Sequence, residues 1–158
     1  MEVEKKKGGF KKINLIFLGI FFIAFLFLSV WNLRTPSADV VLKDKNLKVM
    51  IANTPEKRLK GLSDRKDLGK FDGMMFLFDD FSRHGFVMRD MLFNIDIVWF
   101  NSGKVVDIAP NLQPENVPEN ELKVYYPRKD ANMVLELPAG WAEQNNLKIG
   151  DILTVSDK

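Results

Sequence analysis

The sequence predicts a mainly β protein, a compact β-sandwich or partly closed barrel with two short helices, behind one N-terminal transmembrane helix. Three observations support this prediction. Residues 13–31 form an apolar run of 19 residues that contains no charged side chain. The chain after it holds roughly seven or eight short apolar segments of strand length, separated by turn residues. Only two later segments resemble helices, and they do not alternate with strands as in α/β proteins.

The apolar run 13–31 is long enough to span a membrane. As a helix rising ~1.5 Å per residue it would measure roughly 28 Å, close to the ~30 Å of bilayer hydrocarbon. The alternative is a cleaved signal peptide, whose apolar core of ~7 to 15 residues precedes a small-x-small cleavage site. The run is longer than that, and the nearby candidate Pro36-Ser37-Ala38 has an unsuitable first residue. We therefore expect an uncleaved signal anchor.

The charges around the run predict its orientation. Five lysines precede it within residues 5–12, whereas only Arg34 follows closely. Cytoplasmic flanks of membrane helices are enriched in lysine and arginine. We therefore expect residues 1–12 to be a cytoplasmic basic tail, 32–46 a linker, and 47–158 a soluble extracytoplasmic domain. The expected localisation is the cell membrane, as a single-pass protein.

The composition excludes several classes of function. The chain has no cysteine, which excludes disulfides, thiolate metal sites and thiol nucleophiles. The first 34 residues carry six basic and two acidic side chains, and the remainder carries 17 basic and 19 acidic ones. A near-neutral domain of mixed charge has no electrostatic footprint for nucleic acid, so we expect no such partner. The basic N-terminus is explained by topology and anionic lipid.

The soluble domain is predicted to begin with a strand and a helix. Residues 40–42 of the linker begin a strand, and Leu47, Val49 and Ile51 then alternate with Lys48 and Met50, as in a half-buried strand. Thr54-Pro55-Glu56 supplies a hydroxyl N-cap, a proline at the first helical position and an acid near the positive end of the helix dipole. This pattern predicts a helix from Pro55 to Leu62. We interpret its basic residues as solvated: Lys57, Arg58 and Lys60.

Later strands are predicted from short apolar runs between turn residues. Asn101-Ser102-Gly103 separates two such runs and indicates a hairpin. Four of the seven prolines lie in residues 110–127, which excludes a central strand or long helix and predicts a long surface loop. Pro138–Asn146 has the pattern of a short helix. The predicted strands are 74–78, 86–88, 95–100, 105–109, 133–137 and 152–155.

Five motifs in order resemble the domain of unknown function 192 family over residues 47–155. They are ANTPEKRLKGLSDR from Ala52, GMMFLF from Gly73, FVMRDMLFNIDIVWF from Phe86, VLELPAGWAEQ from Val134 and KIGD from Lys148. The resemblance implies a small, mainly β domain, often behind a signal or anchor segment, with no established activity.

The central motif departs from the family's usual form, FWMKNTxIPLDIxF. Val87 replaces the usual tryptophan, Arg89 the lysine, Asp90 the asparagine, Met91 the threonine and Asn94 the proline. The changes at Asp90 and Met91 weaken any transfer of a polar site to those two positions.

Two carboxyl groups in apolar strands are the strongest candidates for chemistry. Asp96 and Glu136 each lie between two apolar neighbours, and both faces of their strands are expected to be partly covered. In apolar surroundings the two groups would have raised pKa values and could form an acid–base pair or bind a cation. The alternative, which we favour, is that Arg65, Arg89 or backbone N–H groups hold them as buried structural groups.

No other constellation predicts catalysis, a metal site or a cofactor. His84 is the only histidine, and we interpret it as a turn residue because zinc would need carboxylates alone beside it. A middle region rich in methionine and aromatic residues is expected to be mostly core. Part of it could line an adaptable apolar groove, because methionine repacks around varied ligands.

We therefore expect a membrane-tethered extracytoplasmic binding or accessory domain that recognises a protein segment or a small polar ligand. The alternative is an envelope carbohydrate-active hydrolase or lyase, which would need the Asp96 and Glu136 carboxyl groups about 5 to 9.5 Å apart in one cleft. A second alternative is a purely structural partner of a membrane protein. The expected ligand-binding residues are Arg89, Asp90, Asp96, Tyr125, Arg128 and Glu136.

Overall fold

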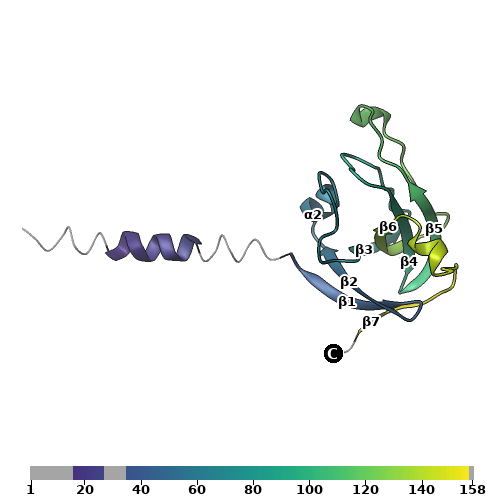
Figure 1. Cartoon of the computed structure of the whole chain (residues 1–158), viewed down its shortest axis with the longest axis horizontal. Helices are drawn as coiled ribbons and strands as arrows, with labels where there is room; N and C mark the ends of the chain where they lie inside the picture. The colour runs from purple at the N-terminus through teal and green to yellow at the C-terminus, as the bar shows by residue number, and fades with distance from the viewer. Residues whose placement is uncertain (1–15, 27–34, 157–158) are drawn as a thin grey trace, which may run out of the picture. The chain divides into compact units, whose positions relative to one another are not determined.

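The chain forms two compact units, Met1–Thr35 and Pro36–Lys158. The structure is a computed structural model, and it describes residues 16–26 and 35–156. Residues 16–26 are helical (Figure 1). Within the described ranges, no helix is both long enough and apolar enough to cross a membrane. The remainder of the predicted span, residues 13–15 and 27–31, lies outside the described residues.

The second unit is built on one seven-stranded sheet, with the strand order β5-β4-β6-β3-β2-β1-β7. Neighbouring strands are antiparallel except for β2 and β3, which are parallel. The strands are β1 Ser37–Leu42, β2 Lys45–Ala52, β3 Gly73–Ser82, β4 Ile95–Asn101, β5 Lys104–Leu112, β6 Ala131–Pro138 and β7 Leu153–Val155. The short helices of this unit are α2 Pro55–Lys60, η1 Glu119–Glu121 and α3 Trp141–Gln144.

The sheet curls until its two edges meet at one point. Lys104, the first residue of the edge strand β5, forms an isolated bridge with Ile152, which precedes the opposite edge strand β7. Leu153 N also donates to the carbonyl oxygen of Gly103 at 2.8 Å. The protein is therefore mainly β, with a single curled half-barrel sheet. This arrangement differs from a two-sheet sandwich, because all seven strands belong to one hydrogen-bonded sheet.

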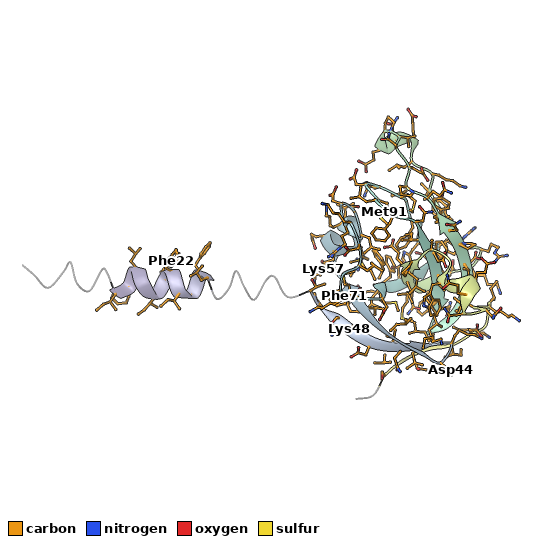
Figure 2. The ribbon with its side chains drawn as sticks, in the orientation of Figure 1. Phe22, Asp44, Lys48, Lys57, Phe71 and Met91 are labelled. Atoms are coloured by element: carbon orange, nitrogen blue, oxygen red, sulfur yellow. The ribbon has the colours of Figure 1, made fainter. Side chains whose placement is uncertain are left out.

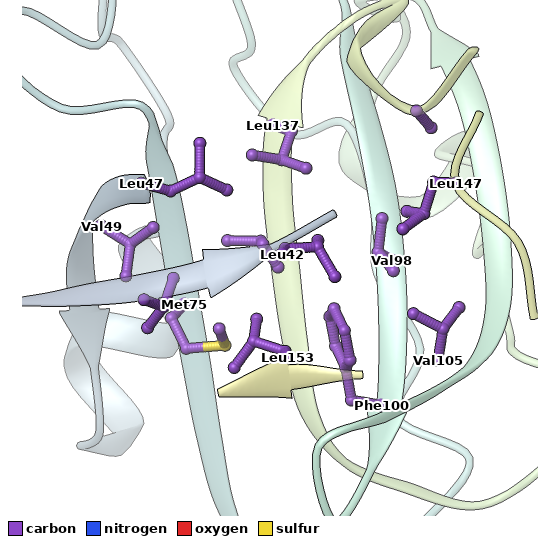
Figure 3. Close-up of a cluster of buried hydrophobic side chains, with 13 residues drawn as sticks. Leu42, Leu47, Val49, Met75, Val98, Phe100, Val105, Leu137, Leu147 and Leu153 are labelled. Carbon is purple, nitrogen blue, oxygen red and sulfur yellow. The ribbon is translucent and has the colours of Figure 1, made fainter. Parts of the chain in front are cut away.

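One face of the curled sheet surrounds a hydrophobic cluster that we call the inner cluster (Figure 3). Strands from both ends of the sheet contribute to it, including Leu42 from β1, Val105 from β5 and Leu153 from β7. Its burial from water drives the sheet to curl. The buried members are Val40, Leu42, Leu47, Val49, Met75, Val98, Phe100, Val105, Leu135, Leu137, Ala142, Leu147 and Leu153.

The opposite face of the central strands is covered by a second cluster, which we call the outer cluster. Its cover comes from the chain between α2 and β4, including Leu62, Met88 and Met91, the last of which is labelled in Figure 2. Because both faces are covered, residues Ile95 to Phe100 of β4 are all buried. The buried members are Met50, Ala52, Leu62, Met74, Phe76, Met88, Met91, Ile95, Ile97, Trp99, Ala131 and Val134.

The predicted hairpin between β4 and β5 is confirmed. Asn101 pairs with Lys104, which leaves a two-residue turn. Ser102 and Gly103 have φ of 48° and 83°, the positive values that the favoured type I′ hairpin turn requires at both central positions.

Two segments differ from the sequence prediction. The strand predicted to begin at residues 40–42 of the linker is β1, which begins earlier, at Ser37, and packs Val40 and Leu42 into the inner cluster. Residues 86–88 were expected to form a strand but make only an isolated bridge, between Phe86 and Tyr125. This segment instead lies over the outer face, where Met88 is fully buried without joining a ladder.

The helices also differ in part from the prediction. Thr54 caps α2 as expected, since its Oγ1 accepts from Lys57 N at 3.4 Å, but α2 ends earlier than predicted because Gly61 adopts a φ of 48°. The predicted helix 138–146 shortens to α3, because Pro138 still pairs with Ile95 as the last residue of β6. A third helix, η1, lies in the proline-rich loop. The strands β2 and β3 that flank α2 are parallel, so one helical crossover is present where none was expected.

Candidate functional site

Asp96 is fully buried and held by three backbone groups. Its Oδ1 accepts hydrogen bonds from Asn111 N at 2.8 Å and Gly140 N at 3.0 Å, and its Oδ2 accepts from Ala142 N at 2.8 Å. These donors lie near the end of β5 and around the start of α3. The carboxyl group of Asp96 therefore joins three elements, and the geometry gives it a structural role.

Glu136 is buried on the outer face of the sheet and has no comparable partners. Its neighbours across the ladder are Met74 on β3 and Ile97 on β4, which are both buried. Glu136 is 5% exposed, and its Oε2 is buried without a hydrogen-bond partner. Removal from water raises the pKa of the Glu136 carboxyl from 4.5 to about 8, so the group is mostly protonated at neutral pH.

The structure does not bring Asp96 and Glu136 together. Asp96 is directly opposite Leu137 of β6, while Glu136 is directly opposite Ile97 of β4. Residues directly opposite share a face, and successive residues along a strand alternate faces. The two carboxyl groups therefore point to opposite faces of the sheet. An enzyme that uses them as a pair needs both in one cleft, which this arrangement does not provide.

Glu136 lines a pocket of about 330 Å³ between the outer face of the sheet and the elements that cover it. The pocket walls come from α2 and the turn after it, from β3, and from residues 84–91. Glu136 is the one acidic residue among the described residues that line it. The volume lies within the range of small-molecule sites, about 300 to 1,000 Å³. We call this cavity the Glu136 pocket.

Arg58 of α2 contributes a half-buried guanidinium group to the Glu136 pocket. Its Nη1 donates to the carbonyl oxygen of Leu77 at 2.9 Å, and the guanidinium carbon lies 5.0 Å from the centre of the Phe78 ring. Both contacts are with β3, so they hold α2 against the sheet. The sequence interpretation of Arg58 as a solvated residue therefore misses its role.

Arg89 and Lys60 add two more positive charges to the lining. Arg89 Nη2 lies 2.5 Å from Glu119 Oε1 of η1, whereas Arg89 Nε is buried and has no hydrogen-bond partner. Lys60 is exposed and forms an ion pair with Asp64. Among these lining residues Glu136 is buried, the two arginines are half-buried and Lys60 is exposed. We call the Glu136 end of the pocket its floor and the end with Arg58, Lys60 and Arg89 its mouth.

Aromatic rings form the middle of the Glu136 pocket. Phe76 and Phe86 meet edge to face, with ring centres 4.9 Å apart, and both line the pocket. His84 stacks on Phe78 with ring centres 3.5 Å apart, and its carbonyl oxygen accepts a hydrogen bond from Trp99 Nε1 at 3.0 Å. These contacts fix His84 as part of the pocket wall.

The other predicted ligand-binding residues lie elsewhere. Tyr125 and Arg128 line a different depression, of about 500 Å³. Arg128 is paired there with Asp107, whose carboxyl group accepts from Arg128 Nε and Nη2 at 3.0 and 2.6 Å. Burial opposes ionisation of Asp107, but the hydrogen bonds from Arg128 outweigh it and hold the pKa of that carboxyl below its ordinary value. Asp90 is exposed on a turn and does not line the Glu136 pocket.

Sequence reasoning therefore selected two residues of the pocket, Arg89 and Glu136, and missed the contribution of α2. The Thr54 cap located this helix but not the face of the sheet that it covers. A helix that connects two neighbouring parallel strands has to pass over one face of the sheet. If the parallel pairing of β2 and β3 had been known, it would have placed Arg58 above the outer face. The sequence does not reveal this pairing, because a single short crossover produces no α/β periodicity.

The arrangement can accept a hydrogen-bond donor at its floor and an anion at its mouth. A buried carboxyl group with a raised pKa is also a feature of catalytic acids, and of ligand sites that bind a donor. Within residues 16–26 and 35–156, no three His, Cys, Asp or Glu side chains gather closely enough to hold a metal ion.

Fold and pocket together define a small β domain with a buried carboxyl group beneath a ligand-sized cavity. The chain belongs to the domain of unknown function 192 (DUF192) family, described as an "Uncharacterized ACR", whose model matches residues 38–155. No curated protein matches the chain.

Two solved structures are similar to this chain. A Sinorhizobium meliloti 1021 protein, described as a candidate transcription regulator, is 22% identical with a TM-score of 0.68, over 78% of this chain and 96% of that one. A Novosphingobium aromaticivorans protein of unknown function is 24% identical with a TM-score of 0.64, over 76% of this chain and 84% of that one. At these identities the likeness shows the fold alone.

Proposed function

We propose that this protein is a membrane-tethered extracytoplasmic binding domain that holds a small polar ligand in the Glu136 pocket. The observation that carries the proposal is the Glu136 carboxyl group, which is buried at the floor of the pocket while its Oε2 has no partner. A buried polar group without a hydrogen bond costs about 1 to 3 kcal/mol, and such groups are rare in folded proteins. A ligand that donates to Glu136 would remove this cost.

The proposed tether and location rest on the sequence. The apolar run 13–31 has the length of a membrane span, and the lysines before it favour a cytoplasmic N-terminus. The domain with the Glu136 pocket would then lie outside the cytoplasm. There it could bind envelope or external solutes and present them to a membrane partner.

A screen for ligand-induced stabilisation tests this function. The full-length protein in a mild detergent is heated with a library of small polar metabolites, because a ligand that binds only the folded state raises its stability. We expect at least one compound to raise the melting temperature. Val87→Trp, which places a larger side chain in the pocket lining, should abolish this response.

Val155→Trp is the matched control, because Val155 is exposed on β7 and does not line the pocket. This variant should respond as the wild type does. Equal stabilisation of all three proteins would place binding outside the Glu136 pocket. A library that stabilises none of them would contradict the proposed function.

A further inference from the structure

The polarity of the Glu136 pocket is ordered from floor to mouth. The floor carries one carboxyl group and no basic partner for its Oε2. The mouth carries Arg58, Lys60 and Arg89; Lys60 pairs with Asp64 and Arg89 with Glu119, two acidic residues that lie outside the described lining. A ligand that matches this order has a hydrogen-bond donor at its inner end and an anionic group at its outer end.

The residues in the middle of the pocket determine which kind of chemical group can join the two ends of the ligand. Phe76, Phe78 and Phe86 line it, and all three rings are in edge-to-face or stacked contact with neighbouring rings. Such walls favour an apolar stem over a polar one, because burying an unpaired polar group against them costs free energy.

The donor that suits Glu136 best is an ammonium group. A carboxylate in apolar surroundings interacts more strongly with a charged donor than with a neutral one, since charge-assisted hydrogen bonds are roughly twice as strong. At the mouth, Arg89 keeps a buried Nε without a partner. A guanidinium group with a free N–H is suited to an anionic ligand group.

We propose that the ligand is a zwitterion whose ammonium group binds Glu136, whose apolar stem contacts the phenylalanine rings, and whose anionic group binds the basic mouth. This inference rests on the proposed function, since it names the class of ligand for the same pocket. The reverse orientation would place the anionic group against the Glu136 carboxyl and away from the basic residues of the mouth, so it is not the orientation proposed.

Calorimetric titration of the full-length protein in a mild detergent tests the proposal with three matched probes. These are ε-aminocaproate, which has both charges, caproate, which lacks the ammonium group, and hexylamine, which lacks the carboxylate. We expect ε-aminocaproate to bind at least about tenfold more tightly than either analogue, which corresponds to ~1.4 kcal/mol. Equal affinity for caproate and ε-aminocaproate, or no binding of any probe, would overturn the proposal.

Two substitutions test which residue of the pocket binds each charged group of the probe. Glu136→Gln retains the shape of the side chain, and it should lower the affinity for ε-aminocaproate at least about tenfold. Glu143→Gln is the control, because Glu143 is exposed on α3 outside the pocket, and it should leave the affinity unchanged. Arg89→Gln should reduce the affinity for ε-aminocaproate to near that for hexylamine. An unchanged affinity in Glu136→Gln would refute the ammonium site while leaving the proposed function open to the library screen.

Proton release gives an independent readout. Because the pKa of Glu136 is about 8 in the empty pocket, ammonium binding at pH 7 should ionise the group and release close to one proton. The other charged or titratable groups that line the pocket are Arg58 and Lys60 from the α2 side and His84 and Arg89 from residues 84–91. Titration in two buffers of different ionisation enthalpy measures the release. It should vanish in Glu136→Gln and persist in His84→Gln; no release in the wild type would contradict the proposal.

Discussion

Asp96 and Glu136 have similar neighbours in the sequence but opposite hydrogen-bonding environments in the structure. Each is a carboxyl residue between apolar neighbours on a central strand, so the local pattern gives both the same interpretation. Asp96 receives three backbone N–H groups, from residues 15 to 46 positions away, whereas Glu136 Oε2 receives none. The difference could not be predicted, because the donors come from segments that the fold alone brings to Asp96.

The raised pKa of Glu136 predicts a pH-dependent stability. The folded state holds this proton up to about pH 8, whereas the unfolded chain releases it near pH 4.5. The unfolded state therefore binds fewer protons between these values, and the free energy of unfolding falls as the pH rises. Between these two pH values, the contribution of Glu136 to the free energy of unfolding falls by up to roughly 1.4 kcal/mol per pH unit. Above about pH 8 this contribution no longer changes.

Glu136→Gln should remove this dependence. Denaturant titrations of both proteins from pH 5 to about pH 9 should show the variant gaining stability relative to the wild type as the pH rises. Glu143→Gln, the exposed control, should track the wild type. Parallel curves for the wild type and Glu136→Gln would show that Glu136 is not a buried protonated group.

Asp96 should respond differently to substitution. Asp96→Ala leaves three buried N–H groups without an acceptor and should lower the free energy of unfolding by roughly 3 kcal/mol or more. Asp96→Asn should cost a similar amount, because both carboxylate oxygens accept N–H groups and an amide nitrogen would oppose one of them. Thermal melts measure both effects, and an unchanged melting temperature in either variant would argue against the structural role.

At the scale of elements, the sequence predicted the parts with local signals. The Thr54 cap, the hairpin at Ser102-Gly103 and the strand predicted at Leu47–Ile51, now part of β2, are confirmed, because capping, turn geometry and local patterning act within a few residues. The parallel pairing of β2 and β3 and the course of residues 84–91 over the outer face depend on distant contacts. These two features build the Glu136 pocket, so the pocket itself was not predictable from local patterns.

Close packing of β3 against β6 makes Gly73 essential to the sheet next to the pocket. A Cβ atom at Gly73 would lie 2.4 Å from the backbone oxygen of Glu136, which a folded protein cannot accommodate without moving a strand. Gly73→Ala should therefore lower the free energy of unfolding by about 1 to 3 kcal/mol. Gly19→Ala is the control, since no atom lies within 4 Å of the added Cβ there. Equal melting temperatures for the two variants would contradict the close approach.

At the scale of the whole molecule, the length of the apolar run 13–31 predicts a retained anchor, and the lysines before it predict an external domain. The protein should remain with membranes after carbonate extraction, and protease added to intact spheroplasts should degrade residues 35–158. Lysed membranes are the control for protease access. A mature N-terminus mapped to Asp39 would show cleavage, and full protection in intact spheroplasts would reverse the orientation.

The central claim is that a small ligand occupies the Glu136 pocket, and methyl NMR with labelled methionine tests it most directly. Met91 lines the pocket, whereas Met133 packs beside the inner cluster on the other face of the sheet. During titration of the full-length protein with the compound that stabilises it most, we expect a saturable shift of the Met91 methyl resonance and none at Met133. A saturable shift at Met133 with an unmoved Met91 resonance would contradict the account.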